Sequence, residues 1–302
     1  MQILENEPMN KHTSFKVGGP ARFFAKVESI EELKAALALA TEKGLPHFIV
    51  GNGTNLLVAD QGFEGVVIEL AGTFSGIEDL GSGMFKVGAA VPLGRFARSA
   101  LKQGFAGIHK LAGIPGTLGG ALYMNAGAYG QEIGNCCTAV TVLDGDGNVR
   151  DIPSAQCGFG YRQSAFQKND AIALSATFQL PAATAQGKTA ADLEAELAEC
   201  MAKRKATQPL NMPNAGSTFK RLDAGATDTP TQIAPGYYIE QAGLKGFRIG
   251  GAEVSTLHAN FIVNAGGATA KDILELSEYV QKSVREKFGI ELKREIILLG
   301  NF

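Results

Sequence analysis

The chain has 302 residues, of which 45% are hydrophobic and 19% are charged, and its formal net charge is −2. This length and composition suffice for two globular domains with buried cores, and they exclude a disordered or collagen-like chain. Acidic and basic residues are interspersed and no apolar run approaches about 20 residues, so we expect neither a nucleic-acid-binding face nor a membrane segment.

Short strands are predicted throughout the first half of the chain, where β-branched and aromatic residues gather between glycine, proline and polar residues. The strand segments are residues 22–27, 47–50, 66–70, 84–89 and 171–180. Residues 139–152 predict a hairpin, because the turn residues DGDG (144–147) separate two apolar stretches.

Two amphipathic helices accompany these strands. The first covers residues 29–44, with Ser29 and Glu32 as a capping box and Gly44 at the stop. The second covers residues 92–104 and begins with a proline in its first turn.

The second half of the chain begins after residues 181–190, which are small, polar and Pro/Gly-bearing and are interpreted as a linker. The predicted elements are a helix at 191–207, a helix near IAPGYYIEQAG, strands at 247–249 and 260–265, a helix at 268–289 and a strand at 291–300. Strands and helices mix without a strict strand–helix–strand repeat, so we expect an α+β fold rather than one doubly wound sheet.

Cysteine and histidine are too scattered for a metal site. The four cysteines lack a C-x-x-C spacing, and the adjacent pair Cys136 and Cys137 suits neither a disulfide nor zinc. We therefore expect no metal, and reduced thiols in a cytoplasmic protein. The polar N-terminus MQILENEPMNKH has no signal-peptide pattern.

Two glycine-rich segments indicate a nucleotide site. GNGTNLLV (51–58) follows a strand, and its glycines allow successive backbone N–H groups to converge on an oxyanion. Alone, this stretch fits an ordinary turn equally well. GIPGTLGGALYMNAGAYG (113–130) carries six glycines, which is typical of backbone lying close to a flat ligand. Neither a Rossmann fingerprint nor a Walker A loop is present, so a dinucleotide would be bound by a different type of loop.

The segment NAGSTFK presents Ser217 without a neighbouring histidine and outside a G-x-S-x-G elbow. It is one of seven motifs that resemble a known family when they are taken in order. They are KHTSFKVGGPARFF, VGNGTNLLV, AGIPGTLGGALYMNAGAYG, YRQSAF, NAGSTFK, GLKGFRIGGAEVSTLHANFIVN and REIILLG. From about Lys11 to Leu299 the set closely resembles the UDP-N-acetylenolpyruvoylglucosamine reductase family, the flavoenzymes that make UDP-N-acetylmuramate for bacterial peptidoglycan.

The resemblance implies an FAD-binding domain of the vanillyl-alcohol-oxidase (PCMH) type, followed by a C-terminal α+β substrate-binding domain. The implied division is an FAD domain at 1–183, with lobes of about 1–75 and 76–183, a linker and helix at 184–206, and a substrate domain at 207–302. One subtype of the family carries an inserted loop whose tyrosine closes over the substrate. The short region after Leu180 contains no tyrosine, so the chain resembles the subtype that lacks this lid.

The resemblance also implies non-covalent FAD and NADPH as co-substrate. Reduced flavin then passes hydride to C3 of the enolpyruvyl group, and C2 is protonated. The residues matching the loop around the FAD pyrophosphate are Gly51, Asn52, Gly53, Thr54 and Asn55. Those matching the segment along the isoalloxazine and ribityl chain are Ile114, Pro115, Gly119, Gly120 and Asn125.

Three residues match the catalytic positions of the family. Arg162 can offer a planar fork to the substrate carboxylate. Ser217 would give its hydroxyl proton to C2 as a general acid. Glu295 is a carboxyl group set against an apolar strand, where desolvation favours the protonated form that donates a hydrogen bond.

Each of these residues taken singly has a simpler interpretation. Arg162 fits a solvated loop arginine, Ser217 fits a turn cap, and Glu295 fits an edge-strand charge beside a lysine or arginine. Their joint occurrence in the ordered motifs favours the catalytic interpretation.

Substrate contacts are implied for Lys220, Arg221, Gln241 and Asn260, since a uridine diphosphate needs cations and donors. The expected partners are UDP-N-acetylglucosamine enolpyruvate and NADPH, bound by a monomer. Two alternatives remain open: another FAD-dependent oxidoreductase of the same flavin-domain family, such as an oxidase using oxygen, and a non-enzymatic nucleotide-binding module.

Overall fold

A computed structural model describes residues 1–222 and 234–302, and it confirms the mixed α+β class. The chain forms two compact units, each assembled from three segments. Unit 1 comprises Met1–Ile3, Phe24–Asn52 and Val66–Arg204. Unit 2 comprises Leu4–Phe23, Gly53–Gly65 and Lys205–Phe302. The division predicted from the sequence, 1–183 and 207–302, stays a prediction, and these units differ from it in two short N-terminal segments.

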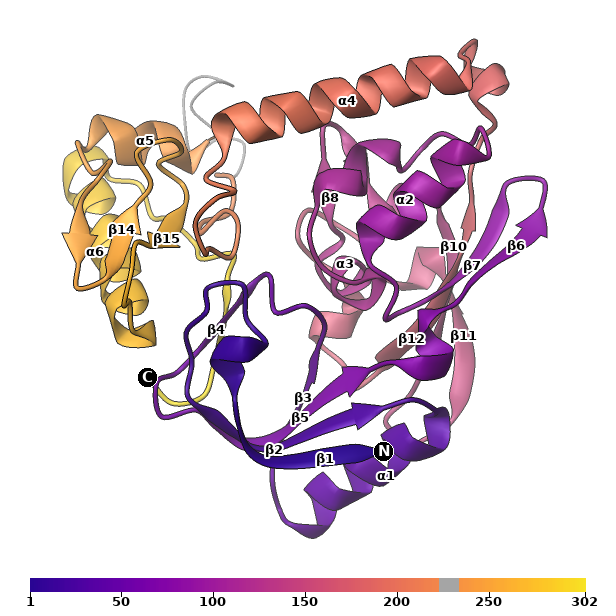
Figure 1. Cartoon of the computed structure of the whole chain (residues 1–302), viewed down its shortest axis with the longest axis horizontal. Coiled ribbons are helices and arrows are strands. Elements are labelled where there is room, and N and C mark those ends of the chain that lie inside the picture. Colours follow the sequence, from indigo (N-terminus) through magenta and orange to yellow (C-terminus); the bar gives the residue numbers. More distant parts are fainter. Residues whose placement is uncertain (223–233) are drawn as a thin grey trace. The chain divides into compact units, whose positions relative to one another are not determined.

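Unit 1 is built around an antiparallel sheet of five strands in the order β11-β10-β12-β7-β6 (Figure 1). The strands are β6 (Ile77–Gly81), β7 (Met84–Gly88), β10 (Cys137–Leu143), β11 (Val149–Pro153) and β12 (Ile172–Gln179). Alternate residues of β12 are buried, from Ile172 to Phe178, as the two-residue period of a strand requires. The sheet therefore presents one face to a core.

Helices α2 (Leu93–Lys102) and α3 (Leu118–Met124) cover that core, and Figure 1 shows them lying together beside the sheet. The rings of Phe96 and Phe178 lie 5.0 Å apart, and those of Phe85 and Phe96 lie 5.9 Å apart. Aromatic pairs at this spacing add to the free energy gained by apolar burial. This packing holds the glycine-rich segment, because α3 is part of that segment.

Unit 2 carries a sheet in the order β13-β14-β15 that packs against α6, and α5 packs against α6. The elements are α5 (Pro235–Gln241), β13 (Arg248–Ile249), β14 (Ala252–Val254), β15 (Ile262–Asn264) and α6 (Ala270–Phe288). Residues of α6 at helical spacing, among them Ile273, Leu276, Val280 and Val284, are buried against the sheet.

A second, parallel pair of strands in unit 2 joins distant parts of the sequence. Strand β4 (Leu56–Val58) pairs with β16 (Ile297–Leu299). Just beyond β4, the carboxylate of Asp60 accepts hydrogen bonds from the main-chain N–H groups of Ala270 (2.7 Å) and Lys271 (2.9 Å). The first turn of α6 is thereby capped by the segment that follows the GNGTN loop.

The remaining strands form a sheet in the order β1-β2-β5-β3 and a short hairpin. Their bounds are β1 (Gln2–Pro8), β2 (Pro20–Val27), β3 (His47–Val50), β5 (Phe63–Leu70), β8 (Gly127–Ala128) and β9 (Gln131–Glu132). The other α-helices are α1 (Ile30–Glu42) and α4 (Ala190–Thr207), of which the latter belongs to unit 1 as far as Arg204.

Seven short 3-10 helices complete the described elements. They are η1 (Met9–Lys11), η2 (Gly72–Ser75), η3 (His109–Gly113), η4 (Ile133–Asn135), η5 (Ser154–Gln156), η6 (Ala165–Gln167) and η7 (Ala183–Gln186).

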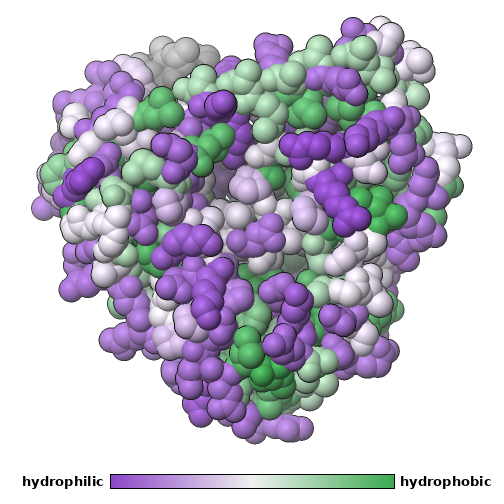
Figure 2. Space-filling model, viewed as in Figure 1, coloured by the Kyte–Doolittle hydropathy of each residue, from purple (hydrophilic) through white to green (hydrophobic). Residues whose placement is uncertain are grey.

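On the face shown in Figure 2, hydrophilic residues predominate and hydrophobic ones form small patches among them. In the described part of the chain, no helix combines the length and apolar character needed to cross a membrane.

The predicted strands and helices are confirmed, with differences at their ends. Pro92 is the N-cap of α2 rather than part of its first turn. The final strand spans only residues 297–299. The segment interpreted as a linker contains η7, and its Ala183 is buried against neighbouring apolar residues. Ile233, at the start of IAPGYYIEQAG, lies outside the described residues.

The capping box of α1 also differs in detail. The Ser29 hydroxyl accepts a hydrogen bond from the Glu32 N–H at 3.2 Å, as predicted. The Glu32 carboxylate, however, accepts from the N–H of Glu28 at 2.8 Å rather than from Ser29.

Candidate active site

Ser217 lies in a turn of unit 2 that main-chain hydrogen bonds fix on both sides. Before it, the side chain of Asn214 accepts a bond from the Gly216 N–H at 2.9 Å, and Gly216 adopts a φ of 79°. After it, the N–H of Thr218 donates to the carbonyl of Asn260 at 2.7 Å. Glycine suits the positive φ, since a Cβ is disfavoured there. The serine is half-buried, and the bonds to Asn214 and Asn260 fix the backbone on either side of it.

Glu295 lies on the segment next to this turn. Its N–H donates to the Thr218 carbonyl at 2.8 Å, and Phe219 forms an antiparallel bridge with Arg294. A further bond joins the Lys220 N–H to the Lys293 carbonyl at 2.9 Å. The residues Ser217 and Glu295, predicted from separate motifs, therefore lie on adjacent strands of backbone.

The GNGTN loop reaches the same place. The Asn55 side chain donates to the Glu295 carbonyl at 3.1 Å, although 240 positions separate the two in sequence. The N–H of Ile297 donates to the Asn55 carbonyl at 2.9 Å, which begins the pairing of β16 with β4. Unit 2 thus brings together one predicted cofactor residue and two predicted catalytic residues.

The four predicted substrate residues are not equivalent in the structure. Arg221 and Gln241 are exposed and Lys220 is half-buried, as expected for groups that reach a ligand. Asn260 is only 5% exposed. Its side chain donates to the Phe219 carbonyl at 2.9 Å and accepts from the Phe219 N–H at 3.1 Å. Its amide is therefore committed to holding the backbone that follows Ser217.

The glycines of the GNGTN loop lie where a side chain would clash. A Cβ at Gly51 would stand 2.5 Å from Thr117 Oγ1 within unit 1. A Cβ at Gly53 would stand 2.0 Å from the His12 carbonyl within unit 2, and the φ of Gly53 is +58°. Asn52, between them, is exposed and Thr54 is half-buried. Each glycine is thus required by the packing of its own unit.

The second glycine segment lies against the start of α2. The N–H of Gly119 donates to the Ala89 carbonyl at 2.8 Å, and a Cβ at Gly119 would approach Ala89 at 3.3 Å. Thr117 caps α3 by accepting from the Gly120 N–H at 3.4 Å. Beside Gly120 the space is open, because the nearest atom to a Cβ there is Thr117 Oγ1 at 3.8 Å. Ile114 is half-buried against the core, and Pro115 is exposed.

This arrangement fits the isoalloxazine and pyrophosphate groups of FAD. In unit 1, exposed Pro115 and Gly120 leave open space beside the backbone, and Gly51 lies next to the same segment at Thr117 without a side chain of its own. Such a surface suits a flat ring and an anionic linker.

Asn125 ends α3 in the left-handed conformation, with a φ of 42°, and is buried. Its amide nitrogen donates to Glu132 Oε2 and to the Gly160 carbonyl, both at 2.9 Å. Its amide oxygen accepts from the Gly134 N–H at 3.0 Å. Both amide hydrogens are used within unit 1, so the side chain fastens together the loops around the glycine segment.

Arg162 has a φ of 51°, a region that a bulky residue rarely adopts. Its guanidinium donates to the Gly127 carbonyl at 3.2 Å and lies over the Tyr161 ring at 5.1 Å. Backbone strain of this kind is held in place by surrounding contacts and is common where a side chain must be aimed. The arginine is half-buried rather than a freely solvated loop residue.

Sequence reasoning missed the part that α4 plays beside the glycine segment. A Cβ at Gly113 would stand 3.0 Å from Met201 Sδ and 3.2 Å from Arg204 Cδ. The Tyr129 hydroxyl donates to the Cys200 carbonyl at 3.0 Å. Burial lowers the pKa of the Arg204 guanidinium. Only the helical pattern of 191–207 was a signal in the sequence, and it did not show which side chains face the glycines.

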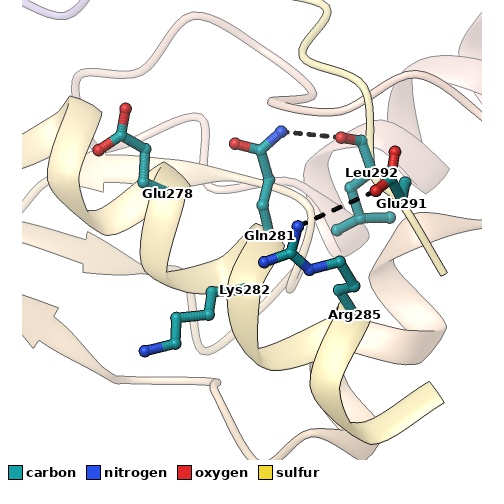
Figure 3. Close-up of a pocket in the computed structure, with 6 residues that line it drawn as sticks. All are labelled: Glu278, Gln281, Lys282, Arg285, Glu291 and Leu292. Carbon is teal, nitrogen blue, oxygen red and sulfur yellow. Dashed lines mark hydrogen bonds and ion pairs between the residues drawn. The ribbon is translucent and has the colours of Figure 1, made fainter. Parts of the chain in front are cut away.

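A separate cavity of about 220 Å³ lies near the end of α6 (Figure 3). Gln281 donates to the Leu292 carbonyl at 2.8 Å, and Arg285 pairs with Glu291 at 4.0 Å across it. None of its lining residues is a predicted site residue, so it does not enlarge the candidate site.

Two family matches cover most of the chain. Residues 21–153 match the FAD binding domain family. Residues 208–299 match the family described as UDP-N-acetylenolpyruvoylglucosamine reductase, C-terminal domain.

Similar proteins span the whole chain. The UDP-N-acetylenolpyruvoylglucosamine reductase of Caldanaerobacter subterraneus subsp. tengcongensis is 43% identical over 303 residues, covering 99% of this chain and 94% of that protein. Its counterpart from Clostridioides difficile is 42% identical over 298 residues, covering 99% and 93%. The crystal structure of UDP-N-acetylenolpyruvylglucosamine reductase from Thermus caldophilus matches with a TM-score of 0.81 and 34% identity, covering 99% and 98%. The chain therefore belongs to the UDP-N-acetylenolpyruvoylglucosamine reductase family, whose members are oxidoreductases, and it carries an FAD-binding domain.

Proposed function

We propose that this enzyme reduces the enolpyruvyl ether of UDP-N-acetylglucosamine to UDP-N-acetylmuramate, with NADPH as the source of electrons and FAD as the carrier. The reaction adds a hydride and a proton across one carbon–carbon double bond. FAD, when bound, supplies the hydride to C3 of the enolpyruvyl group. The chain's own residues then have to place the substrate, stabilise the charge at C2 and deliver the proton there.

Ser217 is the proposed proton donor to C2. A serine in this role has to be held over the right carbon, and it needs no base to make it nucleophilic. The turn 216–218, fixed by its main-chain hydrogen bonds, supports such placement. Glu295 on the adjacent segment and Arg162 in unit 1 are the proposed partners of the substrate carboxylate, where negative charge develops.

The observation that carries this proposal is the hydrogen-bonded assembly in unit 2 of Asn55, Glu295 and Thr218, the residue that follows Ser217. These residues come from motifs separated by up to 240 positions. Convergence of this kind favours a site over three independent structural roles.

Lys220, Arg221 and Gln241 are the proposed contacts for the uridine diphosphate. Their side chains are exposed or half-buried, so charged groups of a ligand can reach them. For Asn260 we propose a supporting role, because its amide is bonded to the Phe219 backbone.

An anaerobic half-reaction experiment tests the function. Purified protein should be yellow and should release flavin on acid or heat treatment. NADPH should bleach the bound flavin, and the enolpyruvyl substrate should then restore its colour. Reduced flavin that stays reduced with this substrate but is reoxidised rapidly by oxygen would identify the alternative, an oxidase of the same flavin-domain family.

A further inference from the structure

His258 lies in a tight turn between β14 and β15 of unit 2. The Ser255 hydroxyl accepts from the N–H groups of Leu257 (3.2 Å) and His258 (3.3 Å). The Phe261 N–H donates to the His258 carbonyl at 2.9 Å, and the Ser255 N–H donates to the Phe261 carbonyl at 2.8 Å. The imidazole meets the Phe261 ring edge to face, with centroids 4.8 Å apart. Both the backbone and the ring of His258 are therefore fixed.

The hydrogen bond at Nδ1 determines the tautomer and the charge of the His258 imidazole. The main-chain N–H of Asn260 lies 3.2 Å from His258 Nδ1. A backbone N–H can only donate, so Nδ1 has to present its lone pair. The imidazole is consequently neutral, with its proton on Nε2.

Asn260 connects His258 to the two residues that follow Ser217. Its carbonyl accepts from the Thr218 N–H at 2.7 Å, and its amide side chain bonds to both the N–H and the carbonyl of Phe219. Three hydrogen bonds from one buried residue thus clamp the two residues after Ser217. A shift of Asn260 would move the serine hydroxyl.

We propose that neutral His258 is a positioning residue for Ser217, acting through the hydrogen bond from Asn260 to Nδ1. This inference rests on the proposed role of Ser217 as proton donor. Protonation of His258 would place an N–H at Nδ1 facing the Asn260 N–H, and the hydrogen bond would be lost. Proton delivery to C2 would then fail at acidic pH, whereas reduction of the flavin by NADPH would not depend on this histidine.

The charged groups that face His258 are consistent with a neutral ring near pH 7. Burial lowers the pKa of His258, a hydrogen bond to its own backbone opposes this effect, Lys245 lowers the pKa further and Glu240 raises it. Lys245 and Glu240 form an ion pair at 2.8 Å and act on the pKa of the ring in opposite directions. From α5, Gly236 brings only backbone close to the ring: a Cβ there would lie 3.6 Å from Cε1. The pKa of His258 is therefore lowered, and the ring takes up its proton at a more acidic pH than an ordinary histidine.

Two substitutions separate positioning from other roles. In His258→Asn the side-chain Oδ1 stands where Nδ1 stood and accepts the same bond, but it cannot be protonated. In His258→Ala no acceptor remains. Both variants are loaded with FAD and followed in the two half-reactions between pH 5 and pH 8, with His47→Asn, an exposed histidine of β3, as the control.

We expect His258→Ala to slow reoxidation by the enolpyruvyl substrate on the order of tenfold to a hundredfold at every pH, because small misplacements of reacting groups have effects of this size. His258→Asn should keep the rate at pH 8 within a few-fold and should lose the decline at acidic pH that the wild type shows. Flavin reduction by NADPH should be unchanged in both. Wild-type acid sensitivity retained in His258→Asn, or an unaltered His258→Ala, would overturn the inference.

The tautomer is measurable without relying on any variant's activity. In nitrogen-15 spectra of the wild-type holoenzyme, the His258 ring should show a protonated Nε2 and a bare Nδ1 at pH 7, with its signals identified by their absence in His258→Asn. A protonated Nδ1 at that pH would overturn the inference. Wild-type reduced flavin that the enolpyruvyl substrate fails to reoxidise would overturn the proposed function instead, and the tautomer would still decide how His258 is held.

Discussion

Ser217 differs from a nucleophilic serine in what surrounds it. Its turn is shaped by Gly216, Asn214 and the Asn260 carbonyl, all of which act on backbone atoms. A nucleophile needs an adjacent base, whereas a proton donor needs a fixed distance to one carbon. The surroundings of this serine favour the second role.

Replacing Ser217 with alanine should therefore slow one half-reaction and leave the other unchanged. We expect Ser217→Ala to keep flavin reduction by NADPH and to lower product formation by roughly two to four orders of magnitude, the usual contribution of a positioned general acid. Stopped-flow absorbance of the flavin measures both steps. Ser283→Ala, on α6, is the control, and an equal loss in both steps of Ser217→Ala would rule out the proton-donor role.

Asn125 combines a left-handed backbone with three hydrogen bonds, and substitution can separate the two contributions. Asn125→Gly keeps the conformation and loses the bonds, so its free energy of unfolding should fall by about 2–3 kcal/mol. Asn125→Ala should lose about 1 kcal/mol more, since a Cβ disfavours a φ of 42°. Denaturant unfolding measures both. Equal values for the two variants would show that the conformation carries no strain.

At the scale of elements, one carboxylate of α4 makes several ion pairs within unit 1. Glu196 lies within 3.1–3.2 Å of Lys110 and the buried His109, and it also pairs with Lys188. Lys188, His109 and Lys110 lower the pKa of Glu196 to about 2. Burial lowers the pKa of His109 as well.

Both shifts make the protein less stable in acid. For Glu196 the stabilisation is complete above its ordinary pKa of 4.5 and is lost as the pH falls from there towards about 2. For His109 the unfolded chain takes up the proton first, so stability declines once the pH falls below 6.5.

We therefore expect Glu196→Gln to lower the Tm at pH 7 by about 2–4 °C, as for the loss of roughly 1 kcal/mol. The difference from wild type should shrink as the pH falls towards about 2 and vanish below it, where the Glu196 carboxyl is protonated and both side chains are uncharged. Glu194→Gln, an exposed position on the same helix, serves as the control. A difference that stays constant with pH would mean that the ion pairs do not hold α4.

Elements with strong local signals could be predicted from the sequence. The DGDG hairpin formed because Asp144 accepts from the N–H groups of Asp146 and Asn148, a bond pattern encoded in the turn itself. Helix α3 was missed because its sequence LGGALYM contains two glycines, which disfavour a helix. Its helical form depends on the Thr117 cap together with packing over the sheet, and the packing is not local.

At the scale of the whole molecule, the motifs identified the candidate site residues but not their arrangement. Ser217, Glu295 and Asn55 were named from separate stretches. The hydrogen bonds that join Asn55 to Glu295, and Glu295 to Thr218 beside Ser217, depend on pairing between distant segments. The proposed roles of Asn260 and His258 in holding the serine could not be predicted from the sequence either. The identity of a residue does not show whether its side chain is buried or which backbone groups it bonds.

Cofactor binding should stabilise the whole molecule. Each tenfold increase in free FAD above its Kd should add about 1.4 kcal/mol to the free energy of unfolding and raise the Tm of apoprotein accordingly. FMN, which lacks the adenylate half, should give a smaller rise at equal concentration, since residues 51–55 are predicted to hold the pyrophosphate. Calorimetry of apoprotein with each flavin provides the measurement. Equal shifts with FAD and FMN would exclude that placement.

We also predict that the holoenzyme elutes from gel filtration with the mass of one chain.

The parallel pairing of β4 with β16 has a consequence for how the protein is made. Residues 56–58 leave the ribosome long before their partners at 297–299 have been translated. At about 5–20 residues per second, the nascent chain waits of the order of ten seconds or more before this pairing can form. The loop that ends in Asn55 thus acquires this neighbour late, so fragments whose translation stops before residue 297 lack it. Deletion of residues 297–299 would remove it as effectively.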